Sequence, residues 1–557
     1  MLLLFSYRRI RFCRLYLFAV LIFNADWNSA FAQAALPVQQ VSFVDGTGVD
    51  LSDQAIIELL KPSGTSLIGT ILTDEQIDAA AMEMSKLTRG AGWVISRVVV
   101  TDADVSILAN TGTLRFTLLK GAVGKISVQN TSKVHDQRIV NTIAAALCDG
   151  IDVVGKCTGD KALNATDLER AQLLVGDIPG VLVSPPTLSS DGVDVGQTHL
   201  TEVATTLGDP IIYGMTADNY GPKSIGEGRV TGTVLASNVF GEGDILKVLG
   251  TVTNKNYDSG NVDLSFPIGY RGWRAYVNYL RNHFVINNSE LAGDSSALSG
   301  GVSYPIYRAY GYNLKINLGL SDGNGRSTFG GSVLGDSTTK FAQLGITLDD
   351  GDRRRIAGES FTTASLTIND GRLNINDSAS LEVDAKTAHT EGHYVKTDYS
   401  LQHKQNLYSG ADGMYLLANL HGQFASKNLS AGENLSSGGI SAVRAYPVEE
   451  TTANAGHVLQ LDLKQPFALD NVALTSGVFL DAAHIKVDQN LWPQTGKAAA
   501  TRENSRNLYG AGVELEGTFG TSISFGLMWA YRLGSEASVA EPNGSRSRLW
   551  ANVSFQF

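Results

Sequence analysis

The sequence of 557 residues contains little cysteine, proline or charge. Three Cys exclude a scaffold held together by many disulfides, and 13 Pro exclude a collagen-like or proline-rich disordered chain. Charged residues make up 18% of the chain, compared with about 25% in ordinary soluble proteins. After the first thirty residues no run of 18 apolar residues occurs, which excludes a bundle of membrane-spanning helices. A closed β-barrel is the other structure that can span a bilayer.

The sequence is rich in glycine and has a net negative charge. It contains 59 Gly in 557 residues, which is above the roughly 7% of average proteins. Its formal net charge is −11, so it lacks the basic surface that a nucleic-acid partner requires. Hydrophobic residues make up 43% and the mean hydropathy is −0.02, both unremarkable. The length fits several domains or one very large closed sheet.

The first 34 residues are typical of a secretory signal peptide. Four Arg precede an apolar run at residues 15–23, and the small residues Ala30, Ala32 and Ala34 provide cleavage sites after residue 32 or 34. The run of nine residues is too short to span a bilayer as a helix. We therefore expect an exported protein, with an amphipathic N-terminal anchor as the alternative.

Two cysteines remain after removal of the signal peptide, Cys148 and Cys157. In an oxidising compartment they are expected to form a disulfide that closes a small loop. A metal or redox pair is the less favoured alternative, because the spacing is not CxxC and no His lies between them.

Residues 38–122 and 123–202 each mix helical and strand periodicity, which predicts two consecutive α+β modules. The apparent capping boxes Thr73 with Gln76 and Thr166 with Glu169 predict two of the helix starts. The first module is expected to contain strands at 41–44, 93–100 and 114–119, and helices at 53–60 and 74–89. The second is expected to contain strands at 125–128, 181–183 and 199–205, and helices at 137–147 and 166–174.

From about residue 203 the helical period disappears and apolar residues alternate strictly with polar ones, as at 312–321 and 549–557. Segments of about ten residues with one apolar and one polar face fit the strands of a transmembrane β-barrel. A soluble sandwich is the alternative, but the segments are long and aromatics such as Trp273 and Trp529 lie near strand ends. Residues 203–557 allow about 16 strands. Lipid-facing and water-facing residues would then cancel in the mean hydropathy.

No enzyme motif occurs in the sequence. HExxH, GxSxG, the Walker A pattern and CxxC are all absent, and the nine His are scattered. Residues 322–326 begin like a calcium loop, but the fifth position is Arg326, so a hairpin turn is expected instead. No catalytic residue, cofactor or metal site is predicted.

Several segments resemble the two-partner secretion transporters, an outer-membrane family that exports haemolysins and filamentous adhesins. The segment LERAQLLVGDIPGV at 168–181 resembles part of their second POTRA domain, and the segments at 72–77, 92–96 and 112–116 resemble the first. The segment at 423–446 resembles a stretch that ends in GGxxxVRGY, the tip of a loop folded into the barrel lumen. The matching residues are Gly438, Gly439, Val443, Arg444 and Tyr446. Residues 477–481 resemble an F-x-D motif of the barrel wall, with Phe479 and Asp481.

The resemblance implies two periplasmic POTRA domains at 38–122 and 123–202, followed by an outer-membrane β-barrel at 203–557, of about 16 strands, with a lumen-folded loop near 428–452. It also implies that Arg444 reaches Asp481, which strand alternation places on the lumen face together with Phe479. Ala445 stands where the family usually has Gly, and would cost about 1 kcal/mol if its backbone were left-handed. Phe557 resembles the terminal signal by which such barrels are recognised for assembly.

The implied function is a translocation pore that secretes a large β-helical exoprotein. Its expected partners are the exoprotein's N-terminal secretion domain, bound by the POTRA domains, the outer-membrane lipids, and the barrel assembly machinery. An N-terminal plug helix is not expected, because the first predicted strand begins soon after the cleavage sites. Two alternatives are a factor that assembles outer-membrane proteins and a passive porin with a periplasmic binding module.

Overall fold

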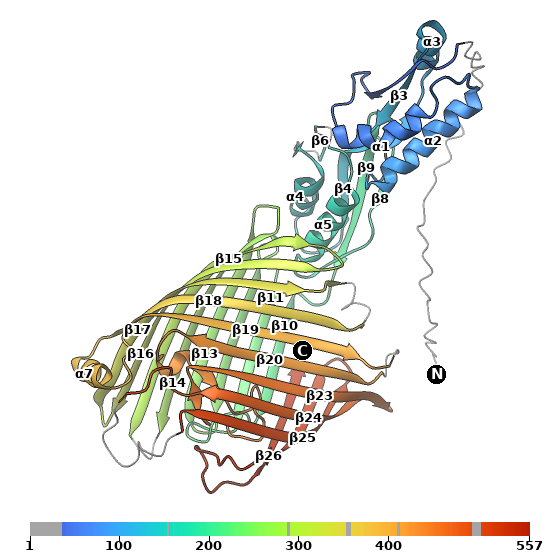
Figure 1. The fold of residues 1–557 in the computed structure, drawn as a ribbon. Coiled ribbons are helices and arrows are strands. Elements are labelled where there is room, and N and C mark those ends of the chain that lie inside the picture. Colours follow the sequence, from blue (N-terminus) through green and yellow to red (C-terminus); the bar gives the residue numbers. More distant parts are fainter. Residues whose placement is uncertain are drawn as a thin grey trace. The chain divides into compact units, whose positions relative to one another are not determined.

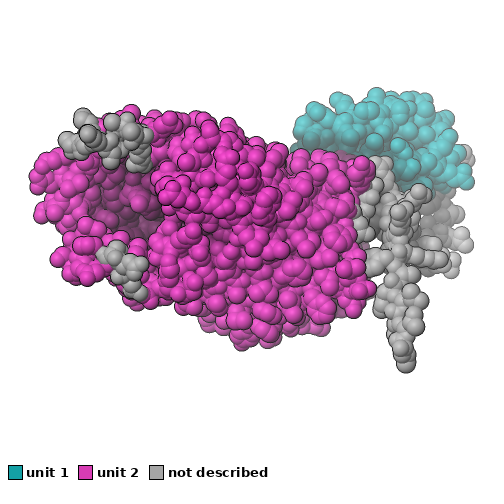
Figure 2. All heavy atoms as spheres, turned by 90° about the horizontal axis from the view of Figure 1, so that it is seen from below, with its two compact units in different colours: residues 1–88, 97–119 teal, residues 89–96, 120–557 magenta. Residues whose placement is uncertain are grey.

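The computed structural model describes residues 36–152, 155–159, 161–286, 290–352, 358–408, 413–492 and 503–557 (Figure 1). The signal peptide predicted at 1–34 lies outside these residues. The described chain forms two compact units, one of residues 36–88 and 97–119 and the other of residues 89–96 and 120–557 (Figure 2). None of the described helices has both the length and the apolarity that a bilayer-spanning helix requires.

The first unit combines a three-stranded sheet with helices. Its elements are β1 (Gln40–Asp45), α1 (Gln54–Thr65), α2 (Asp74–Gly90), β2 (Arg97–Val99), α3 (Asp102–Thr111) and β3 (Thr113–Leu119). The central strand β3 runs parallel to β1 and antiparallel to β2. Leu60, Met84, Leu108 and Phe116 are fully buried, so helices and sheet share one core.

The helix α3 is absent from the sequence-based prediction, which placed a longer strand at 93–100. The structure has a strand only at Arg97–Val99, followed by a helix that Thr101 caps reciprocally with Asp104. This helix buries only Asp104, Val105 and Leu108, so its apolar stripe is weak. The predicted capping box of α2 is present, because the Thr73 N–H donates to Gln76 Oε1 at 2.9 Å and the Gln76 N–H donates to Thr73 Oγ1 at 3.4 Å.

The second module is an α+β layer within the second unit. Its elements are β4 (Ala122–Asn130), α4 (Asp136–Leu147), β5 (Gly150–Ile151), β6 (Cys157–Thr158), α5 (Ala165–Gly176), β7 (Val181–Val183), β8 (Thr187–Ser189) and β9 (Gln197–Thr206). The strand order is β4-β9-β7, with β8 also paired to β9. The boundary expected at residue 203 falls inside β9, whose pairing with β4 extends to Ala204. The capping box expected at Thr166 is wrong, because Asn164 accepts the Thr166 N–H and starts α5 earlier.

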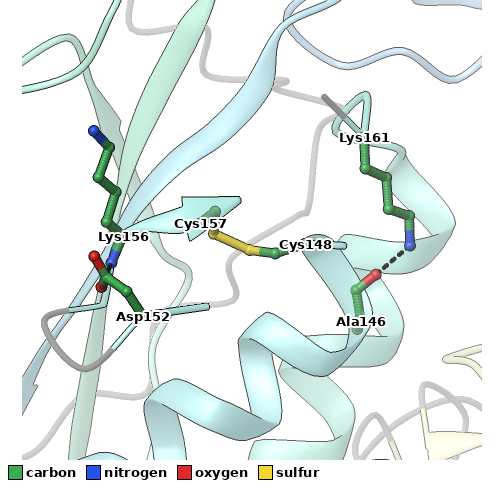
Figure 3. The surroundings of a disulfide bond; sticks show 6 residues. All are labelled: Ala146, Cys148, Asp152, Lys156, Cys157 and Lys161. Atoms are coloured by element: carbon green, nitrogen blue, oxygen red, sulfur yellow. Dashed lines mark hydrogen bonds between the residues drawn. A yellow bond between two sulfur atoms is a disulfide. The ribbon is translucent and has the colours of Figure 1, made fainter. Parts of the chain in front are cut away.

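Cys148 and Cys157 are joined by a disulfide that links the C-terminal end of α4 to β6 (Figure 3). Their Cα atoms are 5.6 Å apart, inside the usual range for such bonds. Within the closed loop the Lys156 N–H donates to Asp152 Oδ1 at 2.8 Å, and beyond it Lys161 Nζ donates to the Ala146 carbonyl of α4 (Figure 3). The disulfide therefore holds this loop against the end of the helix.

The remainder of the second unit is a closed antiparallel barrel of 16 strands, which confirms the predicted fold class (Figure 1). The strands are β10 (Ile211–Asp218), β11 (Arg229–Ser237), β12 (Ile245–Thr253), β13 (Asn256–Ile268), β14 (Trp273–Ile286), β15 (Leu291–Arg308), β16 (Asn313–Phe329), β17 (Ser332–Asp349), β18 (Phe361–Ile375), β19 (Gly392–Asn406), β20 (Tyr415–Ala425), β23 (Ala455–Leu469), β24 (Val472–Lys486), β25 (Ser505–Phe519), β26 (Ile523–Leu533) and β27 (Ser547–Gln556). We call the end next to the second module proximal and the opposite end, where α7 (Ser378–Lys386) lies, distal. The hairpin turn predicted at 322–326 is wrong, because these residues lie inside β16.

The second module is fastened to the proximal end of the barrel by the motif that the sequence singled out at 168–181. Asp177 pairs with Arg308 of β15, with 2.6 Å between Oδ1 and Nη2. The Arg170 Nη2 donates to the Pro305 carbonyl at 2.9 Å, and Glu169 accepts the Tyr310 N–H. Glu169, Arg170 and Asp177 of this motif thus face the barrel.

The two faces of the barrel wall differ as alternation predicts. Along β24, the side chains of Val478 and Leu480 are 53% and 56% exposed, whereas Phe479 and Asp481 are 2% and 3% exposed. The first pair therefore lies on the outer face and the second pair in the lumen.

The lumen face itself has two kinds of wall. In the middle of β15, β16 and β17 its residues are small and, apart from Ala297 and Phe341, polar or glycine, and none is charged. They are Ser295, Ala297, Ser299, Gly301, Ser303, Asn317, Gly319, Ser321, Gly323, Gly325, Ser337, Thr339, Phe341, Gln343 and Gly345. We call this the uncharged wall. The lumen face of β23, β24 and β25, in contrast, carries ionic residues, and we call it the charged wall. They are Asp462, Lys464, Asp481, Arg506 and Glu514.

Candidate functional site

The connection between β20 and β23 folds into the barrel and packs on the charged wall. We call residues 426–454 the lumen loop. It contains the 3-10 helix η1 (Ala431–Glu433) and the short paired strands β21 (Leu435–Ser436) and β22 (Thr452–Ala453). Val443 and Tyr446 are fully buried and belong to one apolar cluster with Phe479 and Leu508 of the barrel wall. The lumen loop therefore has a defined seat rather than an open position in the pore.

The two glycines of the motif shape the tip of the lumen loop for different reasons. Gly439 has a φ of +91°, a left-handed conformation that favours glycine. A Cβ on Gly438 would lie 2.2 Å from the Pro447 carbonyl oxygen, so the backbone passes too close for a side chain. The Gly439 N–H donates to the Tyr446 carbonyl at 3.0 Å and closes the tip. The chain thereby turns back and presents Arg444 to the wall.

Arg444 binds Asp481 through both its side chain and its backbone. Its Nη2 donates to Asp481 Oδ1 at 2.6 Å, its Nε donates to Oδ2 at 3.0 Å, and its N–H donates to Oδ2 at 2.9 Å. The side chains of Arg444 and Asp481 are 5% and 0% exposed. Charge-assisted bonds of this kind, shielded from water, are the strong ones. Breaking such a buried pair by removing one partner typically costs about 3–5 kcal/mol.

Further residues around Arg444 were not predicted from the sequence. Its Nη1 donates to Asp462 Oδ1 at 2.6 Å and lies 3.8 Å from Glu514. Lys464 lies 3.1 Å from Glu514 and so adds a second cation to the cluster. The polar lumen-facing positions of β23 and β25 were visible as alternation, but which of them meet Arg444 depends on the register of three strands.

Two aromatic residues complete the seat of Arg444. Its guanidinium carbon lies 3.7 Å from the centre of the Phe479 ring, a cation–π contact. The Trp550 Nε1 of β27 donates to the Arg444 carbonyl at 2.8 Å. The F-x-D pattern of β24 thus contributes both of its side chains, and the lumen loop also contacts the last strand of the barrel.

Ala445 is accommodated without the backbone penalty that a left-handed conformation would bring. Ala445 is not one of the described non-glycine residues whose φ is positive. Its methyl group faces Gly510 of β25, where a Cβ would lie 2.9 Å from the Cβ of Ala445. The space that Ala445 takes up is therefore supplied by a glycine on the wall.

The two remaining predicted residues of the site lie at its edges. The Tyr446 hydroxyl donates to the Glu536 carbonyl at 3.1 Å, in the connection between β26 and β27. Phe557 is 72% exposed, and its N–H donates to the Tyr213 carbonyl of β10 at 2.9 Å. The C-terminal residue is therefore part of the pairing that closes the barrel.

The chain combines two α+β modules, a closed barrel of 16 strands and an Arg-bearing loop in the lumen, and with the family match below these features define the class of β-barrel transporters of the outer membrane. Residues 197–517 match the family model described as haemolysin secretion/activation protein ShlB/FhaC/HecB, and the chain belongs to this family.

Relatives agree with this assignment. The chain is 23% identical to the heme/hemopexin transporter protein HuxB of Haemophilus influenzae, over 82% of this chain and 78% of the relative. It is also 23% identical to the outer membrane transporter CdiB of Dickeya dadantii, over 74% of this chain and 70% of the relative. The chain is therefore a two-partner secretion transporter of the bacterial outer membrane, and a secreted exoprotein is its partner.

Solved structures share the fold. CdiB from Escherichia coli superposes with a TM-score of 0.70 at 18% identity, covering 95% of this chain and 92% of that chain. BamA from Haemophilus ducreyi lacking POTRA domains 1–3 has a TM-score of 0.50 at 12% identity, covering 94% of this chain and 100% of that chain.

Proposed function

We propose that the two α+β modules capture the N-terminal secretion domain of a large β-helical exoprotein, which then passes unfolded through the barrel while the lumen loop moves from its seat. The transport step needs no catalysis by the chain itself. Folding of the exoprotein outside the cell would supply the driving force.

The observation that carries this proposal is the ionic seat of the lumen loop. Arg444 contacts Asp462 and Asp481 on the charged wall, and all three side chains are at most 5% exposed. These ion pairs hold the lumen loop in one position. When water enters the seat, the guanidinium and each carboxylate can be hydrated instead. A loop seated by ion pairs is therefore suited to leave and return, whereas a purely apolar plug would resist wetting.

Capture by the modules is supported by their open sheet edges. In the first unit β1 and β2 are the outer strands, and in the second module β4 and β7 are the ends of the main sheet path. An extended segment of the exoprotein can add to such an edge through backbone hydrogen bonds. We propose the same chemistry for the barrel assembly machinery, with β27 and the terminal Phe557 as the recognised segment.

The seat of the lumen loop is tested by Arg444→Ala and Asp481→Ala. Both variants should cut secretion of the partner at least about tenfold, because the loop loses its defined position, while the heat-modifiable migration of the folded barrel persists. Arg281→Ala is the matched control, since Arg281 is largely exposed and its nearest carboxylate, on Asp294, lies 3.9 Å away. Normal secretion by both lumen variants would contradict the proposal.

Capture is tested separately by deleting residues 38–120 from the full chain. Binding of the purified secretion domain should be lost, whereas the barrel should still assemble. Binding that matches that of the complete protein would show that recognition lies elsewhere.

A further inference from the structure

The lumen loop has another buried ion pair besides those that Arg444 forms with Asp462 and Asp481. Arg506 Nη1 of β25 donates to Glu450 Oε1 at 2.7 Å. The side chains of Glu450 and Arg506 are 0% and 6% exposed. Glu450 lies six residues after Arg444 and belongs to none of the matched motif positions. An ion pair this well shielded is retained only where its remaining hydrogen bonds are also satisfied.

Those hydrogen bonds come from the connection between β26 and β27, residues 534–546. The hydroxyl of Ser538 and the N–H of Val539 both donate to Glu450, the latter at 2.9 Å. Arg506 Nη2 in turn donates to the Ala537 carbonyl at 2.7 Å. The lumen loop and this distal connection therefore share one polar cluster.

The same connection flanks the seam where the barrel closes. The register between β10 and β27 covers five residue pairs, whereas every other pair of neighbouring barrel strands covers eight or more. Across the seam, Lys223 in the connection between β10 and β11 lies 2.9 Å from Glu541. The Ser224 N–H of that connection donates to Glu449 Oε2 of the lumen loop at 3.3 Å. Adjacent glutamates of the loop thus contact connections on opposite sides of the seam.

We propose that Glu449 and Glu450 form a clasp, with Glu450 and Arg506 as positioning residues of the lumen loop. While the loop is seated, the clasp keeps the two distal connections at 219–228 and 534–546 together. The loop leaves its seat only when these connections separate, so release of the loop and loosening of the distal seam are one event. This inference rests on the proposed function and specifies how its moving part is controlled.

The clasp is tested first by a distance measurement that does not depend on secretion. Spin labels are placed at Glu227→Cys and Asn543→Cys of the full chain in lipid nanodiscs, and their separation is measured by pulsed electron paramagnetic resonance. Glu450→Gln should broaden this distribution and move it to longer distances, because Ser538, Val539 and Arg506 lose their carboxylate. Glu433→Gln is the matched control: it breaks the loop's ion pair with Lys396 (2.6 Å), away from the clasp, and should leave the distribution unchanged.

The second test locks the clasp. Lys223→Cys with Glu541→Cys is bridged by a reductant-cleavable bis-methanethiosulfonate linker on intact cells. The bridged protein should secrete at least about tenfold less than the same protein after reduction. Equal secretion before and after reduction would overturn the clasp, as would an unchanged label distance in Glu450→Gln. Failure of the proposed function would appear in a different experiment, as normal secretion by Arg444→Ala. The distance measurement would remain valid in that case.

Discussion

The uncharged wall and the charged wall line the same lumen, yet their side chains differ in almost every property. On β15 to β17 the side chains are short and offer exchangeable hydrogen bonds, such as the 2.9 Å contact between the hydroxyls of Ser299 and Ser321. On β23 to β25, Lys464 and the three carboxylates of Asp462, Asp481 and Glu514 form a buried network with Arg444 of the lumen loop. One side of the pore therefore holds the loop, whereas the described residues in the middle of the other side carry no charge.

Adding charge to the uncharged wall should have the largest effect on transport. The double substitution Ser299→Arg and Ser321→Arg places two long cations on the uncharged wall. These would pair with carboxylates of the passing exoprotein. Secretion should fall at least about tenfold, which corresponds to about 1.4 kcal/mol in the rate-limiting barrier. The readout is the amount of processed partner in the medium. Ser299→Ala with Ser321→Ala is the control and should secrete normally; an equal loss would mean that the hydroxyls themselves matter.

A smaller effect is expected from a substitution at Gly510, the glycine of the charged wall that leaves space for Ala445 of the lumen loop. Gly510→Ala adds a Cβ that would lie 2.9 Å from Ala445 Cβ and 3.2 Å from Val443 Cγ1. Overpacking of this kind typically costs about 1–3 kcal/mol, so the loop should become accessible to protease added outside. Ala445→Gly in the same chain removes the clash and should restore protection. If the double variant is cleaved as readily as Gly510→Ala, the two residues are not a packing pair.

The smallest effect on transport is expected outside the lumen, in the second module. Burial raises the pKa of Glu202 to about 7 from 4.5, although the Val203 N–H and the Gln172 side chain donate to it. Between these values the folded module keeps a proton that the unfolded chain has lost. The free energy of unfolding therefore falls as the pH rises from about 4.5 to 7, by up to about 3 kcal/mol.

Glu202→Gln should abolish this pH dependence and stabilise the module above pH 7. Hydrogen exchange of the β4 and β9 amides in the full chain, corrected for the intrinsic pH effect on exchange, measures it at pH 5 and pH 8. A wild-type module that is equally protected at both values would contradict the assignment. Transport through the lumen should not change in this variant.

Alternation, the length of the alternating region and the motif residues were sufficient to predict the barrel, its strand number and the α+β elements before it. They failed where the local signal was weak: α3 buries only three residues, and the cap of α5 lies two positions before the predicted one. A turn-like composition was also misleading at 322–326, because glycines can lie inside a strand as well as in a turn, as Gly323 and Gly325 do in β16.

Only the residues of the site that belong to a local sequence motif could be predicted. Arg444 and Asp481 were expected to meet because both belong to recognised motifs. Asp462 and Trp550 join them through strand register and barrel closure, which no local pattern reveals. Glu450 and Arg506 are ordinary polar residues in the sequence, and only the fold makes them a buried pair.

The comparison of the two walls is tested most directly by site-specific photocrosslinking during secretion. A photoreactive amino acid is placed at Ser321 on the uncharged wall, at Lys464 on the charged wall, or at Leu320, which is 69% exposed on the outer face. A partner stalled during passage should crosslink strongly from Ser321 and not from Leu320 or Lys464. Crosslinks from Lys464 without crosslinks from Ser321 would contradict passage along the uncharged wall.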